Sequence, residues 1–267
     1  RPQPQSAMAP VFPRALSRKK IERSAMAEQL PSAIVLAGGF GTRLKDLAQG
    51  RPKPMVDING RPFLEFVVEH LRRQGVPQIL LSVGYKAEHI EEHFGDGARF
   101  GVPIRCIRET EPLGTGGALR LSLPYVGERA LALNGDSYVA VDLAAMLALH
   151  RRESADFTFA AVHRSDASRF GRMNVEGARL VAFEEKQAEG APGLINAGVY
   201  LFERSVLESI PEGRAVSLER ETVPALLSAG RPVAVLRHDG YFEDIGVPEG
   251  LSAFRSAAPS LPFLRSA

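Results

Sequence analysis

A glycine-rich turn with two cations close to it offers the clearest chemistry in the sequence. The turn reads Gly38-Gly39-Phe40-Gly41-Thr42-Arg43 and follows a short apolar run, Ile34-Val35-Leu36-Ala37. Because glycine has no Cβ, an anion can approach the backbone N–H groups of such a turn. Arg43 supplies a guanidinium, and Lys53, which lies between two prolines, supplies an ammonium. The stretch therefore predicts a site for a nucleotide phosphate.

The turn differs from two better-known phosphate loops. No Gly-Lys-Ser/Thr closes it, as a Walker A sequence requires, and Leu44 stands where the dinucleotide fingerprint has its third glycine. A simpler interpretation is a tight strand-to-helix turn that uses glycine for positive φ alone. Thr42-Arg43-Leu44 and the later Pro52-Lys53-Pro54 favour the phosphate site instead.

Two aspartates, Asp136 and Asp244, each follow an apolar stretch typical of a strand. Ligands of open α/β sheets bind at the carboxyl ends of strands, so we expect both carboxylates to face one site. Mg²⁺ takes one or two protein carboxylates together with substrate phosphate oxygens and water. We therefore expect Mg²⁺ at this pair; the alternative is that each aspartate caps the helix after it.

Polar residues that suit a sugar occur in the second half of the chain. Glu184, Glu185 and Lys186 end a predicted strand, where neighbouring residues face opposite sides, so only one of the two glutamates should face a cleft. A solvated charge cluster is the alternative. Asn196 lies close to Gly198, and its amide both donates and accepts hydrogen bonds, as sugar hydroxyls require.

Other catalytic chemistries find no support in the sequence. The six histidines form no metal-like cluster, no Gly-x-Ser-x-Gly turn occurs, and the lone cysteine, Cys106, lies in a predicted strand as a core thiol. A single cysteine cannot form an intramolecular disulfide, which fits a reducing compartment. We therefore expect a cytoplasmic protein.

The composition is that of an ordinary globular protein, with 45% hydrophobic and 24% charged residues. A formal net charge of +2 gives no global field for nucleic acid, and no apolar run reaches the roughly 18 residues of a membrane-spanning helix. We expect neither nucleic-acid nor membrane binding. Residues 1–30 are expected to be a disordered extension, residues 31–258 a single domain, and residues 259–267 a tail.

The elements that must position these residues alternate between strand and helix in the first half of the chain. Apolar periodicity predicts strands at 34–37, 78–83, 104–108 and 130–133, and helices at 62–74, 87–94, from the glycine turn 112–117 through 121, and at 143–150. Strands then dominate, at 157–162, 172–175, 180–184, 198–202, 233–236 and 241–245, with helices at 218–227 and from 248. The pattern predicts an α/β fold with a Rossmann-like, mostly parallel sheet, helices on both faces, and a mixed-strand portion in the second half. This second portion holds the polar residues that suit a sugar, so we expect it to be sugar-binding.

Taken in order, the motifs resemble those of sugar-1-phosphate nucleotidyltransferases. The matching segments lie between about Ala33 and Phe254 and comprise residues 36–44, Pro52-Lys53-Pro54-Met55, Asn134-Gly135-Asp136, Glu185-Lys186, Asn196-Ala197-Gly198 and Asp244-Ile245-Gly246. Segments 61–66, 111–118 and 242–249 look most like the guanylyltransferases that act on D-glycero-D-manno-heptose 1-phosphate.

The resemblance implies a role for each motif. Arg43, Lys53 and Asp136 would be catalytic, and Asp136 and Asp244 would hold Mg²⁺. The nucleoside triphosphate would lie on Leu36, Ala37, Gly38, Gly39, Gly41, Thr42, Arg43, Lys53, Gly114 and Thr115. The sugar phosphate would lie on Gly135, Glu185, Lys186, Asn196 and Gly198.

The charges of such substrates indicate a mechanism without a general base. A sugar 1-phosphate is largely a dianion at neutral pH, since its second pKa is about 6, so it is already a nucleophile toward the α-phosphorus of the triphosphate. Catalysis then reduces to alignment and neutralisation of charge. Guanine presents N1–H and N2–H₂ side by side, which one carboxylate accepts, so Glu109 or Glu111 would read guanine and GTP is the favoured nucleotide.

Other activities stay open at this point. Uridylyl transfer, thymidylyl transfer and guanylyl transfer onto mannose 1-phosphate belong to the same class. A non-catalytic nucleotide-sugar sensor is an alternative of a different class, but it has no need for Arg43, Lys53, Asp136 and Asp244 together. The sequence also leaves open whether the chain forms a homo-oligomer.

Overall fold

The computed structural model describes residues 29–39, 50–167, 171–184 and 191–261. The predictions for Gly41, Thr42, Arg43, Glu185 and Lys186 lie outside these residues, as do those for residues 1–28 and 262–267. Within the described residues, strands from both halves of the chain join one nine-stranded sheet in the order β5-β4-β1-β6-β11-β8-β12-β10-β9.

The first half of the chain builds parallel strands separated by helices. β1, β4, β5 and β6 pair in parallel, with Leu36 opposite both Ser82 and Asn134. The elements are β1 (Ala33–Leu36), α2 (Phe63–Arg73), β4 (Ile79–Val83), α3 (Ala87–Phe94), β5 (Ile104–Arg108), α4 (Gly114–Leu121) and β6 (Arg129–Asn134). A small hairpin of β2 (Asp57–Ile58) and β3 (Arg61–Pro62) precedes α2. The predicted alternation of strand and helix is confirmed.

The second half of the chain extends the same sheet with mixed strand directions. β11 (Gly193–Glu203) runs antiparallel to β6 and to β8 (Phe157–Arg164), while β12 (Val233–His238) runs parallel to β8. β10 (Arg179–Glu184) and β9 (Arg172–Glu176) pair antiparallel at the edge. The mixed-strand portion is therefore confirmed as a continuation of the parallel sheet.

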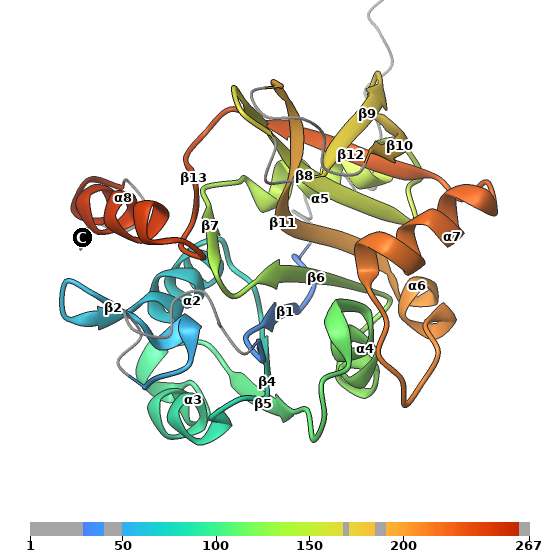
Figure 1. Cartoon of the computed structure of the whole chain (residues 1–267). Coiled ribbons are helices and arrows are strands. Elements are labelled where there is room, and N and C mark those ends of the chain that lie inside the picture. Colours follow the sequence, from blue (N-terminus) through green and yellow to red (C-terminus); the bar gives the residue numbers. More distant parts are fainter. Residues whose placement is uncertain (1–28, 40–49, 168–170, 185–190, 262–267) are drawn as a thin grey trace, which may run out of the picture.

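Helices cover both faces of the sheet because successive strand residues point to opposite sides. In β1, Ala33 and Val35 belong to one hydrophobic core and Ile34 to the other. The first core includes side chains of α2, α3, α5 (Leu143–Arg152) and α8 (Pro248–Ala257); the second includes those of α4, α6 (Arg204–Ser209) and α7 (Val223–Ser228). Figure 1 shows α2, α3 and α8 to the left of the sheet and α4, α6 and α7 to its right. None of the described helices is long and apolar enough to cross a bilayer.

A two-stranded ribbon places Asp244 beside Asp136. β7 (Ser137–Val139) pairs antiparallel with β13 (Phe242–Asp244), and the N–H that follows Asp244 donates to the carbonyl oxygen of Asp136 at 3.0 Å. Helix α8 approaches this ribbon closely at Gly250, where any Cβ would clash with the carbonyl oxygen of Asp244. The ribbon thus joins two aspartates that are far apart in the sequence.

The structure corrects the expected elements in three places. The helix expected over 218–227 is a π-helical turn, Leu218–Thr222, followed by α7, because Pro224 has no N–H to continue the hydrogen-bond ladder. β11 begins at Gly193 rather than at 198, since a bulge lets the strand continue through Gly198. The sequence pattern does not reveal β7 or α6, which are too short to show a period.

Candidate active site

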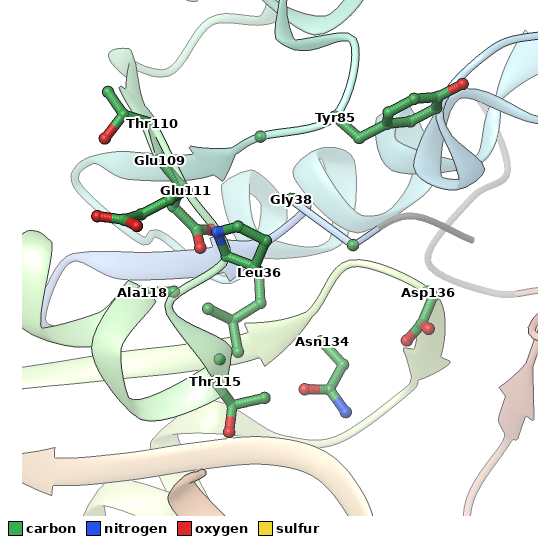
Figure 2. Close-up of a pocket in the computed structure, with 14 residues that line it drawn as sticks. Leu36, Gly38, Tyr85, Glu109, Thr110, Glu111, Thr115, Ala118, Asn134 and Asp136 are labelled. Carbon is green, nitrogen blue, oxygen red and sulfur yellow. The ribbon is translucent and has the colours of Figure 1, made fainter. Parts of the chain in front are cut away.

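A pocket of about 530 Å³ lies at the carboxyl ends of β1, β4, β5 and β6. This is the edge at which open α/β sheets bind their ligands. In Figure 2, Glu109, Thr110 and Glu111 lie at one end of the pocket and Asp136 lies at the other. The lining residues are Leu36, Gly38, Gly39, Gly84, Tyr85, Glu109, Thr110, Glu111, Pro112, Gly114, Thr115, Ala118, Asn134 and Asp136.

The two described glycines of the glycine-rich turn serve different purposes. A Cβ at Gly38 would lie 2.6 Å from Glu109 Oε1 and 3.3 Å from the backbone nitrogen of Gly84. A Cβ at Gly39 would meet no atom of the described residues within 4 Å. Gly38 therefore lets the Glu109 carboxylate lie against the end of β1, and Gly39 leaves open space beside the pocket.

Glu109 follows β5 and forms part of the pocket wall. Its Oε1 accepts a hydrogen bond from Ser82 Oγ at 3.0 Å, and its Oε2 accepts one from the N–H of Leu113 at 3.3 Å. Burial raises the pKa of the Glu109 carboxyl, and these two hydrogen bonds oppose the rise. Each oxygen retains a second lone pair for a ligand. Glu111 is exposed at the rim, so Glu109 is the better placed of the two glutamates to contact a ligand inside the pocket.

Lys53 and Asp136 form an ion pair at the other end of the pocket. Lys53 Nζ lies 2.6 Å from Asp136 Oδ2. Lys53 begins a 3₁₀ turn, Lys53–Met55, in which Pro54 restricts the backbone, and its side chain is only 15% exposed. The Asp136 side chain is 41% exposed and lines the pocket, so it can bind a further ligand.

Asp136 and Asp244 together fit a Mg²⁺ ion that arrives with a phosphate. In the described part of the chain, no group of three or more His, Cys, Asp or Glu side chains is arranged to hold a metal. Asp244 Oδ1 accepts from the N–H of Gly246 at 2.7 Å, and a Cβ at Gly246 would lie 2.7 Å from both that oxygen and Lys53 Nζ. The two carboxylates and the ammonium therefore share one corner. Two carboxylates are enough for Mg²⁺ when phosphate oxygens and waters complete its shell.

Asn196 and Gly198 lie at a β-bulge in β11, where the register of its pairing with β8 shifts between Asn196 and Val199. Asn196 Oδ1 accepts from the N–H of Gly198 at 2.8 Å, and Asn196 Nδ2 donates to the hydroxyl of Tyr200 at 2.9 Å. Gly198 has φ +76°, and a Cβ there would lie 2.5 Å from Asn134 Nδ2. The bulge thus packs against Asn134, which lines the pocket.

The structure brings most of the described nucleotide-site candidates to one wall. The shared lining residues are Leu36, Gly38, Gly39, Glu109, Glu111, Gly114 and Thr115. Asp136, predicted as a catalytic and metal-binding residue, also lines the pocket, whereas Lys53 is not among the lining residues. Ala37, and Gly135 of the predicted sugar-phosphate site, are buried beneath this wall instead. The N–H of Ala37 donates to Ser82 O at 2.8 Å, and that of Gly135 donates to Leu36 O at 2.9 Å. These two N–H groups hold β1 to its neighbours, and ligand contact by Ala37 or Gly135 stays a prediction.

Sequence reasoning missed several pocket residues. Gly84 and Tyr85 follow β4 as Gly38 follows β1, and a glycine directly after a buried strand is a signal that could have found them. Thr110, Pro112, Ala118 and Asn134 also line the pocket. Asn134 belongs to the Asn134-Gly135-Asp136 segment, in which only Gly135 and Asp136 were predicted to be site residues.

Comparison with known proteins identifies the family. The model of the family described as "Nucleotidyl transferase" matches residues 32–259. This chain belongs to the nucleotidyl transferase family. The mannose-1-phosphate guanylyltransferase of Mycobacterium tuberculosis is 40% identical to it over 248 residues, which cover 90% of this chain and 69% of that protein. The D-glycero-alpha-D-manno-heptose 1-phosphate guanylyltransferase of Campylobacter jejuni is 37% identical over 217 residues, 81% of this chain and 95% of that protein.

A solved structure shows the same nucleotidyl transferase fold. HddC from Yersinia pseudotuberculosis, complexed with GMP-PN, superposes with a TM-score of 0.75 at 32% sequence identity. The match covers 85% of this chain and 99% of HddC. The predicted resemblance to sugar-1-phosphate nucleotidyltransferases, and to the heptose 1-phosphate guanylyltransferases among them, is confirmed.

Proposed function

We propose that this nucleotidyl transferase moves GMP from GTP onto a sugar 1-phosphate and releases pyrophosphate. The observation that carries the proposal is one continuous pocket with Glu109 at one end and Asp136 at the other (Figure 2). Its volume of about 530 Å³ lies within the range of small-ligand sites, roughly 300–1,000 Å³. A nucleotide whose base lies at Glu109 would extend its phosphates toward Asp136 and Lys53.

The bond changes need alignment and charge neutralisation more than proton transfer. An oxygen of the sugar 1-phosphate attacks the α-phosphorus, and the bond from the α-phosphorus to the bridging oxygen breaks, so that pyrophosphate leaves with the electron pair. The attacking phosphate is already an anion at neutral pH, so no side chain has to remove a proton. Lys53 would then exchange Asp136 for a phosphate oxygen and neutralise charge that develops there.

We also propose that the reaction requires Mg²⁺ at Asp136 and Asp244. When bound, Mg²⁺ would polarise phosphate oxygens and neutralise the leaving pyrophosphate. The support is the donor set: Asp136, directly before β7, and Asp244, at the end of the paired strand β13, both next to the Lys53 ammonium. The ribbon would fix the spacing of these carboxylates before the nucleotide arrives.

Guanine is the proposed base because Glu109 offers a carboxylate inside the pocket. Its oxygens already accept from Ser82 and Leu113, which fixes the orientation of the carboxylate. The carboxylate edge can then accept from N1–H and N2–H₂ of guanine as a pair. The Mycobacterium tuberculosis and Campylobacter jejuni relatives are both named guanylyltransferases, which supports the same choice.

A heptose 1-phosphate of manno configuration is the proposed acceptor. The Campylobacter jejuni heptose 1-phosphate enzyme is matched over 95% of its length, which is the observation that favours heptose. Mannose 1-phosphate is the second candidate, because the Mycobacterium tuberculosis mannose-1-phosphate enzyme has the higher identity of the two, 40%. The two sugars share the ring configuration and differ in the chain beyond C5.

Pyrophosphate release over a grid of substrates tests the proposal. GTP, ATP, UTP and dTTP would each be combined with the 1-phosphates of D-glycero-D-manno-heptose, mannose, glucose and N-acetylmuramic acid, with Mg²⁺ present. We expect release with GTP and heptose 1-phosphate. Faster release with UTP or dTTP would overturn the base assignment. Binding of GTP without release of pyrophosphate from any pair would favour a non-catalytic sensor.

A further inference from the structure

A chain of hydrogen bonds behind the pocket joins its nucleotide side to the bulge in β11. Glu219, in the π-helical turn, accepts from Thr115 Oγ1 through Oε2 at 3.2 Å and from the Tyr200 hydroxyl through Oε1 at 2.9 Å. The same hydroxyl accepts from Asn196 Nδ2 at 2.9 Å. Asn196 Oδ1 then accepts from the N–H of Gly198 at 2.8 Å. The connection therefore runs without a break from α4 to β11.

The Tyr200 hydroxyl fixes the direction of each bond in this chain. It accepts from the side-chain amide of Asn196, and because the Glu219 carboxylate can only accept, its single proton points to Glu219. Burial, and next the negative charge of Glu219, raise the pKa of the Tyr200 phenol well above its usual range, so the proton stays on the hydroxyl. Because Asn196 Nδ2 faces the hydroxyl, Asn196 Oδ1 must face Gly198, and the amide cannot turn over.

Glu219 is suited to this place because a carboxylate only accepts. Among the described residues its hydrogen-bond partners are three hydroxyls, those of Thr115, Tyr200 and Ser217. Its two oxygens accept from the two sides of the connection separately: Oε2 accepts from Thr115, and Oε1 accepts from Tyr200. An amide has one acceptor oxygen and so cannot accept on both sides.

Both sides of the connection reach the pocket. Thr115 lines it directly, and so does Asn134, against which Gly198 packs. Both residues lie below Leu36 in the view of Figure 2. We propose that Tyr200 and Glu219 are positioning residues that hold Asn196 in register with the nucleotide pocket, so that the acceptor sugar is aligned with the α-phosphate. The effect on the acceptor rests on the proposed function, whereas the effect on Asn196 itself does not.

Two substitutions separate the two sides of the connection. Tyr200→Phe keeps the ring that fills the core but removes the hydroxyl, so Asn196 is released while the Thr115–Glu219 hydrogen bond stays. Glu219→Gln affects both sides and lies at a half-buried position, so it tests the same idea if Tyr200→Phe folds poorly. Tyr138→Phe is the matched control, because the buried Tyr138 hydroxyl has no hydrogen-bond partner in the described part of the chain.

Steady-state kinetics with GTP and the best acceptor from the substrate grid form the first measurement. We expect Tyr200→Phe to raise KM for the sugar 1-phosphate about tenfold while KM for GTP stays within about twofold of the parent value. Glu219→Gln should raise both KM values, and Tyr138→Phe neither. An equal KM for the sugar 1-phosphate in Tyr200→Phe and Tyr138→Phe would overturn the proposal.

Hydrogen exchange of the Gly198 amide in the ligand-free protein forms the second measurement, and it needs no activity. We expect exchange at Gly198 to be about tenfold faster in Tyr200→Phe, because its acceptor Asn196 is no longer held, while the amide of Leu201 in the same strand is unchanged. Unchanged exchange at Gly198, or equal acceleration at Leu201, would overturn the positioning role. If the parent turns over no substrate pair, the proposed function fails, and this exchange pattern still decides whether Tyr200 positions Asn196.

Discussion

Lys53 Nζ lies 2.6 Å from a carboxylate oxygen of Asp136, although 83 positions separate the two residues in the sequence. The contact joins a proline-rich turn to the end of β6, at the corner that also holds Asp244. Each charge has a partner before any substrate binds. A phosphate and Mg²⁺ can replace those partners, so that neither charge is left unpaired when the substrates bind.

Removing either member of the ion pair should stop turnover without unfolding the protein. For Lys53→Ala and Asp136→Asn we expect kcat for pyrophosphate release to fall roughly 100-fold or more, as for loss of a group that neutralises charge in a transition state. The pair is partly exposed, so each change should cost at most about 1 kcal/mol of stability. Thermal denaturation checks the second point, with Asp239→Asn, an exposed aspartate, as control. Unchanged pyrophosphate release from either variant would remove the pair from the mechanism.

Asp244 should set the Mg²⁺ concentration that the reaction requires, and not only the affinity for the nucleotide. We expect a chelator to abolish pyrophosphate release, and Asp244→Asn to raise the half-saturating Mg²⁺ concentration at least about tenfold, since loss of a mere partner of a metal ligand typically costs that much. Titration of Mg²⁺ at fixed GTP measures this. The control Asp239→Asn should follow the parent curve, and an unshifted curve for Asp244→Asn would place the metal elsewhere.

Much of the fold follows from local sequence patterns, whereas the corner of the site does not. The run from Ile34 to Ala37 predicts β1 because four apolar residues before a glycine turn are a local signal. The contact of Asp136 with Lys53, and its place beside Asp244, depend on the pairing of β7 with β13. The sequence predicts the strand at 241–245, but the three residues of β7 are too few to show a period.

The sequence pattern does not single out the positioning residues Tyr200 and Glu219, for a related reason. Tyr200 occupies an inward position of β11, so its hydroxyl is indistinguishable in sequence from an ordinary core tyrosine. Glu219 lies in the stretch 218–227, which the sequence pattern predicts as a regular helix. Only the π-helical turn, which the sequence pattern does not reveal, directs that carboxylate toward Thr115 and Tyr200.

Glu109 and Glu111 should differ sharply in their effect on nucleotide choice. We expect Glu109→Gln to lower the preference for GTP over UTP, measured as the ratio of kcat/KM values, at least about tenfold, because the amide presents a donor to guanine where the carboxylate accepted. Glu111→Gln, at the exposed rim, is the matched control and should leave the ratio near that of the parent. A larger effect from Glu111→Gln would reverse the assignment.

The Glu109 carboxyl should also give GTP binding a dependence on pH. Burial raises its pKa, so protonation begins at a higher pH than for an exposed glutamate. The protonated form cannot accept from both guanine donors. KM for GTP should therefore rise as pH falls through that raised pKa, and the rise should be absent from Glu109→Gln.

Buried His70 should make the fold less stable in mild acid. Burial lowers the pKa of the His70 imidazole from 6.5 to about 4; the nearby His238 adds to the shift, and the Val141 carbonyl opposes it. Between these values the unfolded chain binds the proton and the folded chain does not. The free energy of unfolding therefore decreases as pH falls from 6.5 to 4, by up to about 3 kcal/mol from this residue.

Urea denaturation across that pH range measures the contribution of His70. His70→Phe keeps an aromatic ring beside Tyr138 and should flatten the pH dependence, whereas His89→Gln, at an exposed position of α3, should not. An equally steep dependence in His70→Phe would mean that other groups govern acid stability. His150, whose pKa burial also lowers, is the next candidate.

The position of the broken bond in GTP tests the central claim most directly. GTP labelled at the α-phosphorus, and separately at the γ-phosphorus, would be incubated with Mg²⁺ and heptose or mannose 1-phosphate, and the products separated. Nucleotidyl transfer predicts the α label in a guanosine diphosphate sugar and the γ label in an equal amount of pyrophosphate, with both products lost in Lys53→Ala. Transfer of the γ label to the sugar, or no labelled sugar product from any acceptor tested, would contradict it.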